Sequence, residues 1–213
     1  MRRLLSVLVF APFVLAGEAG AQIIRPGMRF GEPNAWVSLG VALVTTFDVV
    51  DGTSGGTWQF GDATQYSASI EKPIAGSGLT LGVRGTHARV PLTYSVGSTF
   101  SDADVNVSQV MAVLHAASGR EFHSVLELSL GTTIYSNFRS RTTDTRLEPS
   151  SDADFAFAFG YGFGYNFSPT FAIDIVQDQS TSLHQKTGLT AGQSSSARFT
   201  STRIVARLGL GGR

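Results

Sequence analysis

The chain has 213 residues, no cysteine, and 16 basic residues balanced by 16 acidic ones. The absence of cysteine excludes a disulfide scaffold and cysteine-based zinc sites, and the balanced charge argues against a nucleic-acid partner, which would favour a basic surface. Glycine is abundant, with 24 residues, and lysine occurs only at Lys72 and Lys186. This composition favours an all-β chain.

The first 21 residues have the pattern of a secretory signal peptide. Arg2 and Arg3 precede an apolar run over 4–16, and the small residues Ala19-Gly20-Ala21 follow it. The apolar run is too short to span a membrane as a helix, so we expect cleavage after Ala21. Removal of its two arginines and one glutamate from 16 and 16 would leave 14 basic and 15 acidic residues.

Alternation with a period of two predicts strands in the remainder of the chain. The eight candidates span 35–47, 58–71, 79–94, 104–117, 122–138, 154–167, 170–178 and 199–210. The fourth is irregular, because Val105 and Val107 alternate out of phase with Val110 and Leu114. A β-bulge at 108–109 would bring both sets to one face, since an extra residue changes the parity.

The sixth strand has the strongest pattern in the chain. Between Phe155 and Phe167 every odd position is aromatic, and between Ala156 and Gly164 every even position is alanine or glycine. Successive side chains of a strand point to opposite faces, so one face carries only rings: Phe155, Phe157, Phe159, Tyr161, Phe163, Tyr165 and Phe167. A small rather than polar opposite face favours a narrow barrel lumen with lipid outside.

The connections alternate between long and short. The long ones span 49–57, 95–103, 139–151 and 179–198, and the shorter ones span 72–78, 118–121 and 168–169. Transmembrane barrels have short periplasmic turns and longer outer loops. The pattern therefore predicts an all-β, eight-stranded, antiparallel, up-and-down transmembrane barrel with both termini on the periplasmic side.

Aromatic residues near strand ends indicate two interfacial girdles. The periplasmic set is Trp36, Phe122, Tyr165, Phe167 and Phe171, and the outer set is Phe47, Trp58, Phe60, Tyr94, Tyr135, Phe138, Phe155 and Phe199.

The signal peptide, the eight alternating strands and the loop pattern resemble the small outer-membrane β-barrel proteins of the OmpA, OmpX and OmpW type. The resemblance implies a bacterial outer-membrane location, a short periplasmic segment over 22–34 and a barrel over 35–213. One feature departs from that family. Its members usually finish the last strand on an aromatic residue, whereas this chain ends Leu208-Gly209-Leu210-Gly211-Gly212-Arg213.

Charged residues on the small or polar strand faces predict a network inside the lumen: Arg84, Glu127, Asp174, Arg203 and Arg207, with Glu71 near the rim. Strands seven and eight are neighbours, so Asp174 can pair with Arg207 or Arg203. The network can serve as a structural plug, since eight strands leave a lumen just wide enough for side chains, or as a gate. We expect Asp174→Ala to destabilise the barrel.

Other polar patterns give no catalytic, cofactor or metal site. The repeats Ser101-Asp102-Ala103-Asp104 and Ser151-Asp152-Ala153-Asp154 each offer two carboxylates on one face, fewer oxygens than Ca²⁺ requires, and we interpret them as polar strand ends. His123 and Ser124 point to opposite faces, and His87 and His115 can meet only through tertiary contacts. The sequence therefore predicts a protein that is not an enzyme.

The functional hypothesis is a monomeric outer-membrane barrel with a structural or surface-interaction role, in contact with outer-membrane lipid. The loops 139–151 and 179–198 are the expected contact surfaces for an extracellular or envelope partner. The first alternative is a narrow pore or a conduit for hydrophobic solutes. The second is a secreted lipocalin-like carrier, which would need Phe157, Phe159, Tyr161 and Phe163 inside a cavity.

Overall fold

A computed structural model describes residues 33–46, 49–50, 57–74, 78–147, 151–184 and 195–211, and the expected signal peptide lies outside them. The described chain is almost entirely strand. Its elements are β1 (Ala35–Thr46), β2 (Val49–Val50), β3 (Thr57–Phe60), β4 (Ala63–Ile74), β5 (Leu79–Val96), β6 (Thr99–Gly119), β7 (Phe122–Ser140), β8 (Ser151–Ser168), β9 (Phe171–His184) and β10 (Ser195–Leu210).

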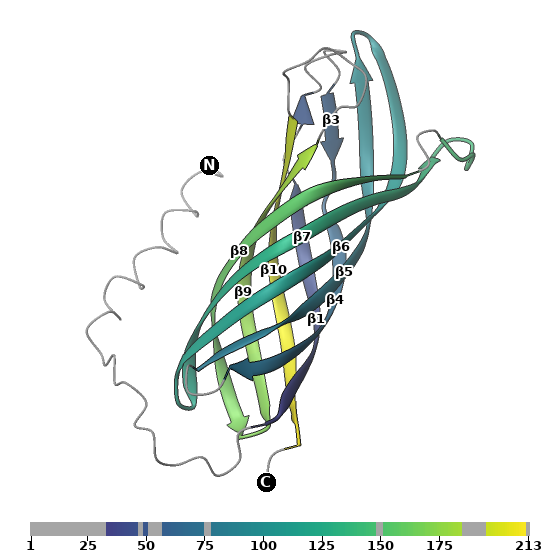
Figure 1. The fold of residues 1–213 in the computed structure, drawn as a ribbon. Coiled ribbons are helices and arrows are strands. Elements are labelled where there is room, and N and C mark those ends of the chain that lie inside the picture. The colour runs from purple at the N-terminus through teal and green to yellow at the C-terminus, as the bar shows by residue number, and fades with distance from the viewer. Residues whose placement is uncertain are drawn as a thin grey trace, which may run out of the picture. The chain divides into compact units, whose positions relative to one another are not determined.

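Eight of these strands form a closed antiparallel barrel, as the sequence predicts (Figure 1). The hydrogen-bonded order runs β5-β4-β1-β10-β9-β8-β7-β6, and pairing of β6 with β5 closes the ring. The short strands β2 and β3 extend it at one end, where β3 pairs with β5 beyond the end of β4. The expected second strand is thus divided in two, with the break at Gly61–Asp62.

The strands tilt strongly against the barrel axis. The row of paired residues that starts at Trp36 runs through Glu71, Gly82, Val113, Ser129, Ala158, Ser180 and Phe199 and returns to β1 at Thr46. The row thus returns to β1 well beyond the residue at which it began. This displacement is the stagger that closure of a barrel requires.

The two ends of the barrel differ. At the terminal end, where Ala35 pairs with Leu210, short turns join β6 to β7 and β8 to β9. At the opposite end, called the distal end below, the sequence predicts a long loop over 95–103, and this expectation is wrong. Strands β5 and β6 instead continue to a two-residue turn at Gly97–Ser98, and their hairpin projects beyond the other strands (Figure 1). Gly97 has φ +58°, which suits a tight hairpin turn.

Strand β6 carries no bulge at 108–109, contrary to the expectation. Burial alternates without interruption from Ala103 to His115, so Val105 and Val107 face inward while Val110 faces outward. The register irregularity lies instead between Asp104 and Asn106, opposite Asn137 of β7, which has φ 53°. Val105 and Val107 can face inward because the distal half of the barrel interior is apolar.

The aromatic face of β8 points away from the barrel axis. Phe155, Phe159 and Phe167 are 55%, 41% and 59% exposed, whereas Ala156 and Ala158 on the other face are buried. Neighbouring strands continue this outward apolar surface, with Leu39, Leu43, Leu128, Ile175 and Leu208 among its exposed members. The barrel therefore carries an apolar belt on its outer wall.

Candidate functional site

Glu127 is the centre of a buried ionic network inside the barrel. Its Oε2 accepts hydrogen bonds from Arg84 Nη1 at 2.5 Å and from Arg203 Nη2. Arg203 also binds Asp178, with 2.6 Å between its Nε and Oδ2. Strands β5, β7, β9 and β10 each contribute one of these four side chains. Each of the four is 7% exposed or less, so the charges rely on one another rather than on water.

A second branch of the network lies nearer the terminal end. Arg207 donates to Glu71 Oε2 at 2.7 Å and to His115 Nε2 at 2.5 Å. A guanidinium only donates, so His115 accepts at Nε2 and donates from Nδ1 to Glu127 Oε1 at 3.0 Å, which joins the two branches. The Trp36 ring lies 5.0 Å from the Arg207 guanidinium, at cation–π distance.

Asp174 connects the network to another buried side chain, that of His123. Its Oδ1 lies 2.9 Å from His123 Nε2, and its Oδ2 lies 3.7 Å from Arg207 Nη1. The structure thus brings together all five charges singled out in the sequence, Arg84, Glu127, Asp174, Arg203 and Arg207, and places Glu71 with them. The closest partners of Arg207, however, are Glu71 and His115 rather than Asp174.

The sequence does not predict three members of the network as part of it: His115, His123 and Asp178. Alternation contains a signal for two of them, because His123 has the parity of Glu127 and Asp178 that of Asp174. For His115 no such signal was available, because the predicted bulge at 108–109 would exchange the faces of all later residues of β6. Among the described residues, the complete network thus contains four carboxylates and two imidazoles around three guanidinium groups.

Two glycines of β8 provide the room for these side chains. A Cβ at Gly160 would lie 2.6 Å from Asp178 Oδ1, and a Cβ at Gly164 would overlap both Asp174 Oδ1 and the His123 ring. The small face of β8 thus has a specific structural role opposite its rings.

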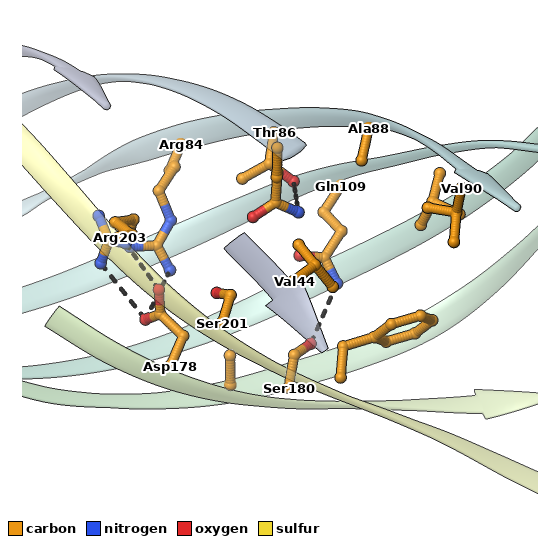
Figure 2. Close-up of a pocket in the computed structure, with 14 residues that line it drawn as sticks. Val44, Arg84, Thr86, Ala88, Val90, Gln109, Asp178, Ser180, Ser201 and Arg203 are labelled. Atoms are coloured by element: carbon orange, nitrogen blue, oxygen red, sulfur yellow. Dashed lines mark hydrogen bonds and ion pairs between the residues drawn. The ribbon is translucent and has the colours of Figure 1, made fainter. Parts of the chain in front are cut away.

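A layer of neutral polar side chains lies on the distal side of the ions. Gln109 Nε2 donates to Thr133 Oγ1 and to Ser180 Oγ, each at 3.0 Å, and Thr133 contacts Ser182 at 2.7 Å. Beside this layer is a cavity of about 30 Å³, with room for one or two water molecules. Figure 2 shows its mixed lining, with Arg84, Asp178 and Arg203 on one side and Val44, Ala88 and Val90 on another.

The distal part of the interior is filled by apolar side chains. Its buried members are Val44, Ala88, Val90, Leu92, Val105, Val107, Tyr135, Phe138, Ala197 and Phe199. Trp58 and Phe60 pack against them. We call this set the distal apolar cluster.

The prediction of an outer aromatic girdle is wrong for several rings, which lie in the distal apolar cluster. Phe60, Tyr135, Phe138 and Phe199 belong to the interior, and Trp36 faces inward at the other end. Phe47 lies outside the described residues. Rings at strand ends can fill a barrel as well as flank a membrane, and strand parity decides which occurs.

The histidine pairs considered in the sequence analysis lie on opposite faces of the barrel wall. His123 is buried and Ser124 exposed, so they face opposite sides as predicted, and His87 and His115 are likewise on opposite sides of the wall. His87 Nδ1 lies 2.9 Å from Ser108 Oγ on the outer surface, but no carboxylate of the described residues contacts His87. Within the described ranges, no three histidine, cysteine or acidic side chains converge to hold a metal ion.

The two Ser-Asp-Ala-Asp repeats lie within β6 and β8 rather than before them. They differ in orientation, because Asp154 is buried while Asp104 lies on the outer face of the distal hairpin. Arg141 Nε donates to Asp104 Oδ1 at 2.9 Å, and Arg89 lies 3.4 Å from Oδ2. The hydrogen bond from Arg141 lowers the pKa of Asp104, and the nearby charges of Arg141 and Arg89 act in the same direction.

The fold is that of the small eight-stranded outer-membrane β-barrels. The chain is similar to Neisserial surface protein A (NspA), with a TM-score of 0.59 and 13% sequence identity over 83% of this chain and 97% of that one. It also matches OprG of Pseudomonas aeruginosa, with a TM-score of 0.47 and 13% identity over 86% of this chain and 97% of that one. The similarity to NspA establishes the fold alone, and that to OprG carries no further argument.

No protein-family profile and no curated protein matches the chain. The described residues contain no helix that is long and apolar enough to cross a membrane.

Proposed function

We propose that the protein is an integral outer-membrane barrel with a closed lumen and a surface-interaction role. In this proposal residues 1–21 direct export and are cleaved, the terminal end faces the periplasm, and the distal end faces outward. The barrel acts as a monomer, without cofactor or catalysis.

The observation that carries the proposal is the contrast between the two faces of the wall. The outer face is a belt of exposed apolar side chains, which water does not favour and a bilayer does. The inner face is filled by the ionic network and, beyond it, by the distal apolar cluster. Solute passage would have to separate buried ion pairs, at a cost of several kcal/mol per ion left alone.

The surfaces available for interaction lie at the distal end. The β5–β6 hairpin carries Arg89 and Asp104 on its outer face. The turn after β7 carries Arg141 and Asp144, and Asp144 pairs with Arg139 at the end of β7. We propose this hairpin, the segment 139–151 and the part of 179–198 between the strands as the contact surfaces for an extracellular or envelope partner. The sequence predicts a loop over all of 179–198, but 179–184 belong to β9 and 195–198 to β10. The hairpin is an addition to the regions that the sequence suggested.

The secreted-carrier hypothesis is wrong for this fold. It requires the rings of β8 inside a cavity, whereas Phe157, Phe159 and Phe163 are 42%, 41% and 46% exposed on the outer wall.

Membrane fractionation tests the location. We expect the protein in the outer-membrane fraction, and unheated samples in detergent should migrate differently from heated ones on gels. Recovery as a soluble protein without detergent would overturn the proposal.

Conductance in planar bilayers tests the closed lumen. The wild-type barrel should show no steady channel. The double variant Arg203→Ala with Asp178→Ala removes a facing pair and should admit intermittent ion flow. Steady wild-type conductance would favour the narrow pore or hydrophobic-solute conduit.

A further inference from the structure

The apolar belt is interrupted on β9 and β10. From the terminal end, the outward side chains of β9 are Phe171, Ile173 and Ile175, and those of β10 are Leu210, Leu208, Ala206 and Ile204. Before the exposed Leu183 of β9, the next three outward positions on each strand are polar. They form a polar patch, defined as Gln177, Gln179, Thr181, Arg198, Thr200 and Thr202.

The patch is two strands wide, with apolar neighbours along β8 and at one position of β1, where the following outward residue, Thr45 beside Thr200, is polar. On β8, the rings of Tyr161, Phe159 and Phe157 pair in register with Gln177, Gln179 and Thr181. On the other side, Leu43 of β1 pairs with Thr202 and is 70% exposed. Within the patch, Thr202 Oγ1 donates to Gln177 Oε1 at 2.7 Å, from strand to strand.

A tilt of the barrel in the bilayer does not explain the patch. Tilt would lift one side of the belt as a whole, whereas here Phe157 and Phe159 of β8 and Leu43 of β1 stay apolar beside the polar residues of β9 and β10. Amide and hydroxyl groups turned toward acyl chains lose hydrogen bonds to water without replacement. An occupant with hydrogen-bonding groups at this depth would remove that cost.

We propose that the patch binds the phosphorylated sugar head group of an outer-leaflet glycolipid, an inference that rests on the membrane location proposed above. Five of the six patch residues are neutral hydrogen-bonding groups, which suit sugar hydroxyls. Arg198, at the distal edge, supplies one cation for a phosphate. Ile175 and Ile204, the exposed residues next to the patch on its terminal side, then contact the lipid's acyl chains.

A second copy of the chain fits the patch less well. Two barrels in one membrane share their orientation, so a two-fold contact through the patch places both Arg198 side chains at the same height across the interface. Two cations facing one another repel, whereas an anionic lipid head group compensates the charge.

The test uses the full barrel in phosphatidylcholine nanodiscs, with lipid A as the probe and dephosphorylated lipid A as its comparison. Lipid retention is measured by native mass spectrometry. Wild type should retain lipid A over phosphatidylcholine, and Arg198→Gln should weaken retention about tenfold, the size expected for loss of one charged hydrogen bond. Gln177→Leu with Gln179→Leu should remove the remaining preference for the sugar.

Two matched controls keep the outcomes apart. Arg120→Gln, at an exposed position near the terminal end, and Thr64→Leu, on the outer face of β4, should leave retention unchanged. Heat-modifiable migration of every sample reports insertion separately. Inserted protein with no lipid preference, equal loss in the controls, or a patch-dependent dimer that forms without lipid A would overturn the glycolipid site while leaving the barrel proposal intact. Failure to insert would overturn both.

Discussion

The two halves of the barrel interior are filled by different physical means. Around Glu127, each buried charge depends on particular partners at hydrogen-bonding distance. In the distal apolar cluster, side chains such as Leu92 and Val105 depend on volume and on exclusion from water. Removal of one ion leaves an uncompensated charge, whereas removal of one apolar group leaves a space that neighbours can partly fill. The ionic half should therefore tolerate fewer substitutions.

The largest effect is expected for the ionic centre. Glu127→Ala removes the acceptor of Arg84, Arg203 and His115 and should lower the free energy of unfolding by about 3–5 kcal/mol. Urea unfolding in lipid vesicles measures this. Glu121→Gln, an exposed carboxylate, is the control and should change stability by less than about 0.5 kcal/mol.

Asp174→Ala should follow the same rule, since it leaves His123 and one side of Arg207 without their carboxylate. We expect a lower temperature of unfolding in detergent than for wild type. An unchanged thermal transition would contradict an inward Asp174 within the network.

In the distal half, Leu92→Ala should cost about 2–4 kcal/mol, the range for large-to-small changes in a core. Leu92→Met preserves the volume and should cost less than about 1.5 kcal/mol. Equal losses for the two variants would mean that the distal cluster also depends on exact partners, and the contrast between the halves would fail.

A smaller effect is expected where glycine makes room for the ions. Gly164→Ala introduces a Cβ against Asp174 and His123 and should cost about 1–3 kcal/mol through overpacking. Gly85→Ala is its matched control, because a Cβ there meets no atom within 4 Å. Similar stabilities for both variants would show that the space at Gly164 is not needed.

The smallest effect concerns the exposed charges of the distal hairpin. The pKa of Asp104 is lowered in the folded state, chiefly by the hydrogen bond from Arg141. Its contribution is therefore fully present above the ordinary carboxyl pKa near 3.8 and disappears as pH falls through the lowered value. Screening limits it to a few tenths of a kcal/mol. The protection of the hairpin amides relative to their intrinsic exchange rates should fall as the pH drops through this range, and Asp104→Asn should abolish that change.

Alternation along the chain was sufficient to predict eight strands, their approximate limits and the outward rings of β8, because side-chain direction in a strand follows from position alone. The same rule predicts that charges such as Arg84 and Arg203 share the inner face. These are local properties, and each strand expresses them independently of its neighbours.

Partner choice was decided by the tertiary structure. Arg207 contacts Glu71 and His115 rather than the adjacent strand's Asp174 most closely, because stagger and tilt set which inward side chains meet across the lumen. The same applies to Val105 and Phe199, which are apolar residues that could face lipid but fill the distal interior instead. Position along a strand determines which side chains share a face, whereas closure of the barrel determines which of the two faces is inside and what each side chain contacts there.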